Sequence, residues 1–155
     1  MRDKRWVAVH RGGQLTPDIH RQLMEWACAC AERVLPLYSG SPDKRLAKAL
    51  ETAQAWKKGK TSVGDARKAA ADLLSLAREI TDPVSVAVVR AVMHAAATAH
   101  MADHAPGAAL YALKAVKNAG RSTDAERTWQ REQLPSEIRE LVLTEMSRKE
   151  KSFNL

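Results

Sequence analysis

Apolar residues recur at three- and four-residue steps along most of the chain, which is the period of an amphipathic α-helix. The first such segment covers residues 17–38, and its apolar positions are Ile19, Leu23, Trp26, Cys30, Val34 and Leu37. Thr16, Pro17 and Asp18 predict its start, because they supply a hydroxyl cap, a proline at the first position and an acid near the positive end of the helix dipole. Pro36 is expected to kink this helix or end it early.

The most continuous hydrophobic segment runs from about residue 82 to 105, and Arg90 is the only formal charge in its long apolar middle. Asp82 followed by Pro83 predicts an N-cap and a first helical residue, and Pro106 is expected to mark the end. A helix that is apolar on all sides belongs in the centre of a bundle. Arg90 and the histidines of this segment argue against a membrane span, so no membrane association is expected.

Similar patterns, bounded by glycine, proline and hydroxyl caps, predict further helices on both sides of this segment. Their approximate ranges are 42–58, 62–80, 107–119, 122–133 and 136–149. The connections are short, and little β-branched alternation is present, so the chain is predicted to be a single all-α bundle of six to seven helices around the buried, alanine-rich helix. This domain would span residues 16–150, between an N-terminal arm or loop at 1–15 and a frayed tail at 151–155.

Composition adds a basic character to this picture. The 155 residues contain 25 Lys and Arg against 18 Asp and Glu, for a net charge of +7, which suits an acidic protein partner or nucleic acid. The charged N-terminus is not followed by an apolar run of the signal-peptide type. Cys28 and Cys30 point to nearly opposite sides of a predicted helix, so they cannot pair within it, and the cytoplasm is the expected location.

The basic residues concentrate between residues 44 and 68, in a predicted helical hairpin. Glu51 and Asp65 are the only acids there, against eight basic residues: Lys44, Arg45, Lys48, Lys57, Lys58, Lys60, Arg67 and Lys68. This surface could bind an acidic protein face or phosphates, but an ordinary solvated surface is the favoured interpretation. Nucleic acid is the less favoured partner, because no helix-turn-helix pattern is present and no aromatic residues alternate with the basic ones.

Histidines and Arg90 form a second group of interest. On a continuous helix, Arg90, His94 and His104 share one stripe, and His100 lies about 40° from His104 around the axis. The i, i+4 spacing of His100 and His104 suits two metal ligands. The candidates for a third ligand are Asp103, Cys30 and His20. The alternative, that these histidines are hydrogen-bonded polar residues in an alanine-lined interface, is favoured because no helical His-Glu-x-x-His motif is present.

Cysteine chemistry offers a weaker candidate. Cys30 could in principle be a nucleophile beside a histidine of the central helix, but no thiol-enzyme signature surrounds Cys28 or Cys30. A buried structural cysteine is the expected role. No catalytic residue and no cofactor are therefore predicted, and a non-enzymatic function is favoured.

Several stretches in a fixed order carry a family resemblance. They are Trp26 to Pro36 (WACACAERVLP), Trp56 before Gly59, His94 to His104 (HAAATAHMADH), Glu126 to Gln130 (ERTWQ), and Leu134-Pro135. In this combination the chain resembles the Imm5-like group of small, all-helical bacterial immunity proteins, over about residues 15–145. The resemblance implies a protein that binds and blocks a cognate bacterial toxin without catalysis. It supplies no catalytic residues to transfer to this chain.

Other function classes remain open at this point. The histidines His94, His100 and His104 could serve a metal-binding protein or an enzyme, and the basic hairpin 44–68 could serve a nucleic-acid-binding module. Self-association is a further possibility, because alanine-rich helix faces allow close packing and one exposed face could form a homodimer.

Overall fold

The computed structural model describes residues 2–155, and over these residues the chain folds into seven α-helices and no β-strand. The prediction of an all-α bundle of six to seven helices is confirmed. The helices, in chain order, are α1 (Pro17–Val34), α2 (Lys44–Lys57), α3 (Val63–Glu79), α4 (Pro83–Ala97), α5 (His104–Asn118), α6 (Thr123–Glu132) and α7 (Ser136–Lys149). None of the helices in this range is both long enough and apolar enough to cross a bilayer.

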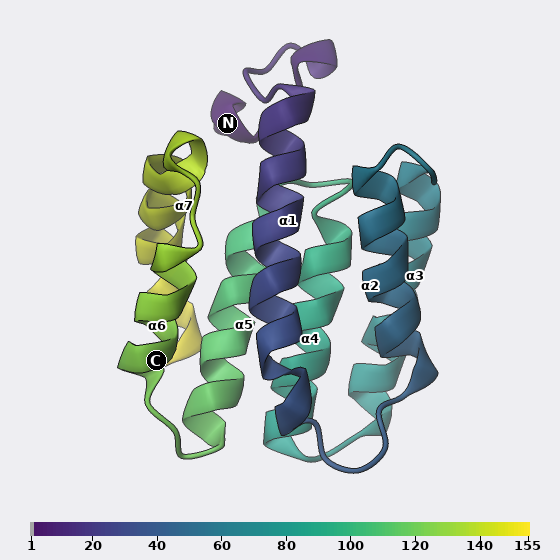
Figure 1. Cartoon of the computed structure of the whole chain (residues 1–155), viewed down its shortest axis with the longest axis vertical. Coiled ribbons are helices and arrows are strands. Elements are labelled where there is room, and N and C mark those ends of the chain that lie inside the picture. The colour runs from purple at the N-terminus through teal and green to yellow at the C-terminus, as the bar shows by residue number, and fades with distance from the viewer. Residues whose placement is uncertain (1) are drawn as a thin grey trace.

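The helices run alternately up and down, with α4 and α5 in the middle of the bundle (Figure 1). The pair α4 and α5 has the most extensive contact between any two elements, and α1 packs across both of them. The α2–α3 hairpin covers one side, and α6 and α7 cover the other. The facing residues of the central pair are mostly alanines without any exposed surface, and examples are Ala91, Ala95, Ala108, Ala109 and Ala112. Small side chains let the two backbones approach closely, so little volume is left empty.

The predicted central helix is wrong in its length. It ends at Ala97 instead of about 105, and Pro106 lies in the first turn of α5 instead of ending α4. The hydroxyl of Thr98 donates to the carbonyl of His94, and the following amides bond three residues back, which tightens and ends the helix. Proline lacks an amide hydrogen, so the first turn of a new helix tolerates it where a helix interior does not.

Most other helix limits follow the predicted signals. The hydroxyls of Thr16, Ser62 and Ser122 each accept a hydrogen bond from the amide three residues later, as expected for N-caps. Helix α1 ends at Val34, and Pro36 lies in a short 3-10 turn after it. Helix α2 begins two residues later than predicted, because the carboxylate of Asp43 caps it by accepting from the Arg45 amide at 2.9 Å.

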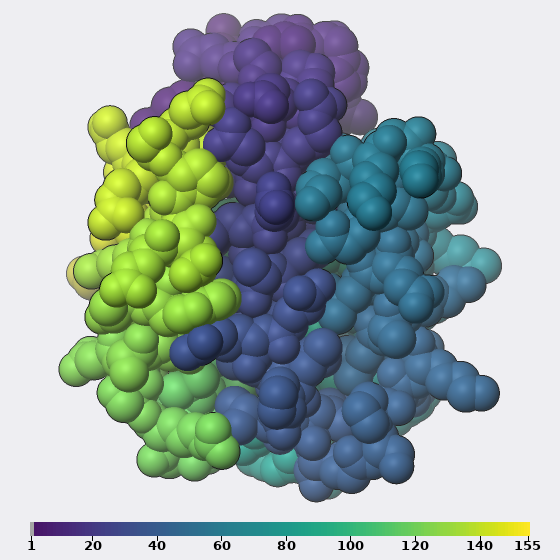
Figure 2. All heavy atoms as spheres, viewed as in Figure 1, coloured from purple at the N-terminus to yellow at the C-terminus, as the bar shows by residue number. Residues whose placement is uncertain are grey.

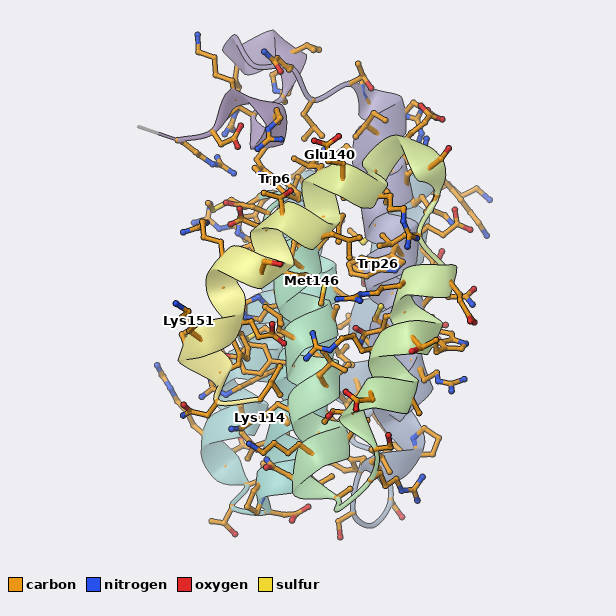
Figure 3. The ribbon with its side chains drawn as sticks, turned by 90° about the vertical axis from the view of Figure 1, so that its left-hand side faces the viewer. Trp6, Trp26, Lys114, Glu140, Met146 and Lys151 are labelled. Carbon is orange, nitrogen blue, oxygen red and sulfur yellow. The ribbon has the colours of Figure 1, made fainter. Side chains whose placement is uncertain are left out.

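The two chain ends pack against the bundle. The arm forms 3-10 turns at Lys4–Trp6 and Val9–Arg11, and it buries Trp6 and Leu15. Residues 151–155, for which we predicted a frayed tail, begin with the last part of a 3-10 turn at Glu150–Phe153. The ring of Phe153 lies 4.7 Å from that of Tyr111, and the Lys114 ammonium donates to the Phe153 carbonyl at 2.9 Å. Figure 3 shows the arm above α7 and the C-terminal turn at the lower end of this helix.

A glycine on α5 makes the close approach of the central pair testable. A Cβ on Gly107 would lie 2.5 Å from Nδ1 of His94, a buried ring that has little room to move. Gly107→Ala is therefore expected to lower the free energy of unfolding by about 1–3 kcal/mol through overpacking. Chemical denaturation and thermal unfolding followed by circular dichroism measure this change.

Gly64→Ala is the matched control, since Gly64 is also helical and a Cβ there meets only the Ser62 hydroxyl at an ordinary 3.7 Å. This substitution should be neutral, or stabilising by up to about 1 kcal/mol, because alanine is the better helix former. Equal stability of the two variants would contradict the proposed tight contact.

Candidate functional site

A large hollow in the described surface lies at one end of the bundle. The alternating helix directions bring four segments there, namely the N-terminal arm, the start of α1, the α2–α3 turn and the α4–α5 turn (Figure 1). Together they line a cleft of about 720 Å³. Figure 2 shows the arm above α1 and the α2–α3 end beside it. Segments far apart in sequence therefore meet at one place.

The lining of this cleft is strongly cationic. Five cations line it, and none of the lining residues is an Asp or a Glu: the five are Arg2, Arg11, Arg21, Lys57 and Arg67. Arg2 forms an ion pair with Asp103 at 3.0 Å, and Lys57 a loose one with Glu25 at 3.8 Å. Within residues 2–155, Arg11, Arg21 and Arg67 have no such carboxylate partner. A cleft with one sign of charge concentrates ligands of the other sign.

Aromatic rings form part of the same wall. The imidazole of His20 lies 4.7 Å from the ring of Trp56, and its Nε2 is 2.6 Å from the Thr98 carbonyl, which places a proton on Nε2. Burial lowers the pKa of His20 below its usual value, and burial also lowers the pKa of His100, with Arg67 adding to the effect. Both rings are therefore neutral near pH 7 and offer hydrogen-bonding groups instead of charge.

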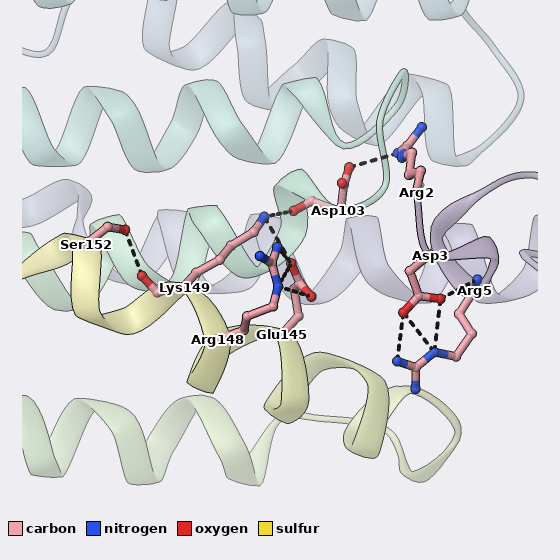
Figure 4. A network of polar contacts seen from close by, with 8 residues as sticks. All are labelled: Arg2, Asp3, Arg5, Asp103, Glu145, Arg148, Lys149 and Ser152. Carbon is pink, nitrogen blue, oxygen red and sulfur yellow. Dashed lines mark hydrogen bonds and ion pairs between the residues drawn. The ribbon is translucent and has the colours of Figure 1, made fainter.

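Asp103 holds the arm to the rest of the bundle (Figure 4). Its carboxylate accepts from the Arg2 guanidinium, and its carbonyl accepts from the Lys149 ammonium at 2.9 Å. The arm, the α4–α5 turn and α7 are thus connected through one residue. Within the arm, Asp3 accepts from the Arg5 side chain and backbone, which fixes its first turn.

The eight basic residues predicted for a partner surface do not share one face. Lys57 and Arg67 line the cleft. Lys58 and Lys60 line a groove beside the same turn, together with Glu32 and Glu51. The other four lie elsewhere along the hairpin: Lys44, Arg45, Lys48 and Lys68. The charge at the turn end is therefore joined by the arm and α1, whose cations lie far away in the sequence.

Carboxylates neutralise much of the remaining hairpin charge. The Arg45 guanidinium pairs with Asp43 at 3.0 Å and with Glu79 at 2.7 Å, at the end of the hairpin away from the cleft. Lys48 and Lys68 line a separate groove that also contains Asp65 and Asp72. This part of the hairpin is therefore less suited to an acidic partner than the turn end.

The predicted histidines do lie close together, although the single helix expected over residues 82–105 is in fact two helices, α4 and α5. Nδ1 of His94 on α4 lies 3.2 Å from Nδ1 of His104, the first residue of α5, so one ring donates and the other accepts. The ring of His100, in the turn, is 5.5 Å from that of His104. His100 and His104 do not share a helical face, so the spacing argument for two metal ligands does not apply. Residues 2–155 contain no group of three or more His, Cys, Asp or Glu side chains arranged to hold a metal ion.

The surroundings of His94 are apolar and cationic. Burial lowers the pKa of His94 to about 3, and His104, Lys149 and Arg90 contribute in the same direction. Its ring lies 4.9 Å from the ring of Tyr111, and the Arg90 guanidinium lies 5.9 Å from the centre of the same tyrosine ring. A neutral hydrogen-bonded pair fits this environment, whereas a metal cation would be repelled by the neighbouring charges.

Cys30 and two of the resemblance tryptophans lie away from the cleft. Cys30 on α1 is completely buried, and burial raises its pKa well above the usual value, so the thiol is protonated and a poor nucleophile. The Trp26 indole donates to the Gln130 carbonyl at 2.9 Å and ties α1 to α6. The Arg33 guanidinium lies 4.3 Å from the centre of the Trp129 ring. Among the resemblance tryptophans, Trp56 is the one that lines the cleft.

Sequence reasoning missed most of the cleft. It named Lys57 and Arg67 in the basic hairpin, and His100 and His20 as possible metal ligands, but it did not bring these two groups together. It also did not name Arg2, Trp6, Arg11 or Arg21 as site residues. The available signal was the high proportion of arginine in the arm and in the first turns of α1 and α3. Only the helix directions show that these arginines lie at the same end of the bundle.

A comparison with protein families agrees with the resemblance found in the sequence. The family model described as Imm-5 like putative immunity protein matches residues 13–137, which is most of the chain. The chain belongs to this family. The match includes the cleft residues of α1, the α2–α3 turn and the α4–α5 turn, and it begins after Arg2, Trp6 and Arg11 of the arm. No curated protein and no solved structure matched the chain.

The buried neutral His94 makes stability depend on pH. An unfolded histidine has a pKa of about 6.5, whereas burial in the folded protein lowers the pKa of His94 to about 3. The contribution of His94 to the free energy of unfolding is therefore greatest above pH 6.5. It decreases as the pH drops below 6.5, by up to about 1.4 kcal/mol per pH unit. Urea denaturation between about pH 6.5 and 5, above the usual carboxylate range, measures this slope.

His94→Gln should reduce that slope, whatever it does to stability at neutral pH. His10→Gln is the control, because His10 is exposed in the arm and the substitution should leave the slope unchanged. The same slope in the parent and in His94→Gln would show that His94 is not held neutral by its surroundings.

Proposed function

We propose that this chain is an immunity-type protein that binds a cognate bacterial toxin in the cytoplasm and blocks it without catalysis. Its membership of the Imm-5 like family supports a role in immunity. The observation that carries the mechanism is the cationic end of the bundle, where five cations and no carboxylates line one cleft. An acidic face of the toxin is the complementary surface.

The rest of the fold suits such a role. The arm, the α2–α3 turn and the α4–α5 turn are held on a closely packed bundle, and a preformed surface loses little conformational entropy on binding. Clustered charge of one sign speeds encounter with an oppositely charged partner, and the gain weakens as salt is added. Blockade then requires only that the bound protein covers the toxin's active site or substrate groove.

Charge reversal at the turn end tests this proposal. Lys57→Glu, Lys58→Glu and Lys60→Glu together should weaken binding to a candidate toxin encoded beside this protein by about tenfold or more, because attraction becomes repulsion. The parent complex should also weaken as sodium chloride is raised. Surface plasmon resonance at two salt concentrations, with growth rescue in cells that express the toxin, measures both effects.

A matched variant separates local contact from net charge. Lys44→Glu, Lys48→Glu and Lys68→Glu change the net charge equally, but these residues lie outside the cleft and away from the turn. Because none of these three residues lines the cleft, and Lys48 and Lys68 share their own groove with Asp65 and Asp72, this variant should bind the toxin more tightly than the turn variant does. Unchanged binding in the turn variant, or an equal loss in both, would contradict the proposed surface.

A metal or enzymatic role for the histidines has its own test. Native mass spectrometry of untagged protein, purified without added metal, should show the mass of the polypeptide alone, because Lys149 and Arg90 disfavour a cation beside His94. One zinc or iron per chain, lost in the double variant His100→Ala and His104→Ala, would favour a metalloprotein instead. The same spectrum gives the oligomeric state and so tests the predicted homodimer.

A further inference from the structure

We propose that the cleft also binds a small organic anion, one that carries a phosphate group next to a flat, apolar ring system, as a nucleoside monophosphate does. This inference goes beyond toxin blockade and does not depend on it. It assigns a ligand to the interior of the cleft, whereas the proposed toxin contact concerns the cationic rim of the cleft and the adjoining α2–α3 turn.

The unpaired arginines are the first argument. Arg11, Arg21 and Arg67 come from three different segments, all line the cleft, and none has a carboxylate within ion-pair distance in residues 2–155. Guanidinium groups donate several hydrogen bonds in a planar fork that matches phosphate oxygens. Like charges held around one hollow repel each other, and a bound dianion would relieve this repulsion.

Two long helices also begin at this cleft. Pro17 at the start of α1, and Val63 and Gly64 at the start of α3, belong to its lining. The partial positive charge of a helix N-terminus favours an anion, and here two termini act in the same direction. The acids in these first turns, Asp18 and Asp65, lie outside the lining.

Polar atoms without hydrogen-bond partners lie in residues of the cleft wall, and this observation is independent of the charges. Trp6 is only 3% exposed, and its indole Nε1 has no acceptor. Nδ1 of His100 is likewise buried without a partner. Both residues line the cleft. Buried polar atoms are normally hydrogen-bonded, so these two nitrogens leave unused hydrogen-bonding capacity in the wall of the cleft.

The size and the apolar part of the cleft indicate an organic ligand instead of a bare ion. Its volume of about 720 Å³ is much larger than a phosphate and lies in the usual range for small-molecule sites. Apolar side chains form much of the wall, among them Leu15, Val63 and Met101. The partly exposed ring of Trp56 lies there too, and aromatic rings stack well on flat ligands.

Titration of the full-length protein with three probes tests the inference without any toxin. AMP should bind with one site per chain, and at least about tenfold more tightly than inorganic phosphate or adenosine, because each of these supplies only half of the chemistry. Isothermal titration calorimetry gives the affinity and stoichiometry. Tryptophan fluorescence should change on AMP binding, since Trp6 and Trp56 both line the cleft.

Two neighbouring cations give a matched pair of variants. Arg67→Gln should weaken AMP binding by about tenfold or more, through loss of a bidentate phosphate contact. Lys68→Gln removes the same charge from the next position of α3, but Lys68 lines a different groove, so its effect should stay within about twofold. Trp6→Phe keeps an aromatic ring and removes the unpartnered donor, and it should also weaken AMP.

The outcomes that overturn the inference are equally specific. Absence of AMP binding at concentrations of about 10 mM would exclude the site, and so would equal losses in Arg67→Gln and Lys68→Gln, which would indicate diffuse surface charge. Thermal unfolding of each variant shows whether it is folded. If AMP binds and the charge-reversed turn variant still binds the toxin, the cleft ligand is supported and the proposed toxin surface is wrong. If AMP does not bind and the turn variant loses toxin binding, the cleft ligand is wrong and the proposed toxin surface is supported.

Discussion

The close packing of α4 on α5 is the constraint on which the rest of the structure depends. Many of the buried residues of both helices are alanines, and Gly107 provides the space for the His94 ring. Two backbones this close need a short, tight connection, which the turn from Thr98 to Asp103 provides. The other helices then pack around this pair, and their directions follow from short connections between antiparallel neighbours.

The same connection determines where the polar groups go. It places His100 and Asp103 at the end of the bundle where the α2–α3 turn and the start of α1 also lie. Asp103 binds Arg2 and receives a hydrogen bond from Lys149, so the arm closes one side of the cleft and the last helix supports it. The cleft is therefore a product of the bundle's connectivity, assembled from four segments that have no sequence relationship.

Charge and burial divide the histidines into two groups with different roles. His94 and His104 share a proton between partly buried rings, and the His94 ring packs beside Tyr111, so they belong to the packing of the bundle. His20 and His100 face the cationic cleft and supply neutral hydrogen-bonding groups there. A sequence pattern that places these residues on one stripe cannot separate the two roles, because the separation depends on which side of a turn each residue lies.

Local signals in the sequence were sufficient for the all-α class, the approximate number of helices and the N-caps of α1, α3, α4 and α6, because caps and hydrophobic periodicity act within one or two helical turns. These local signals could not determine the length of the central helix, because Pro106 can either end one helix or begin the next. The cleft was also decided only in three dimensions. Arg2, Arg21 and Arg67 are distant along the chain, and long-range helix packing alone brings their charges to one hollow.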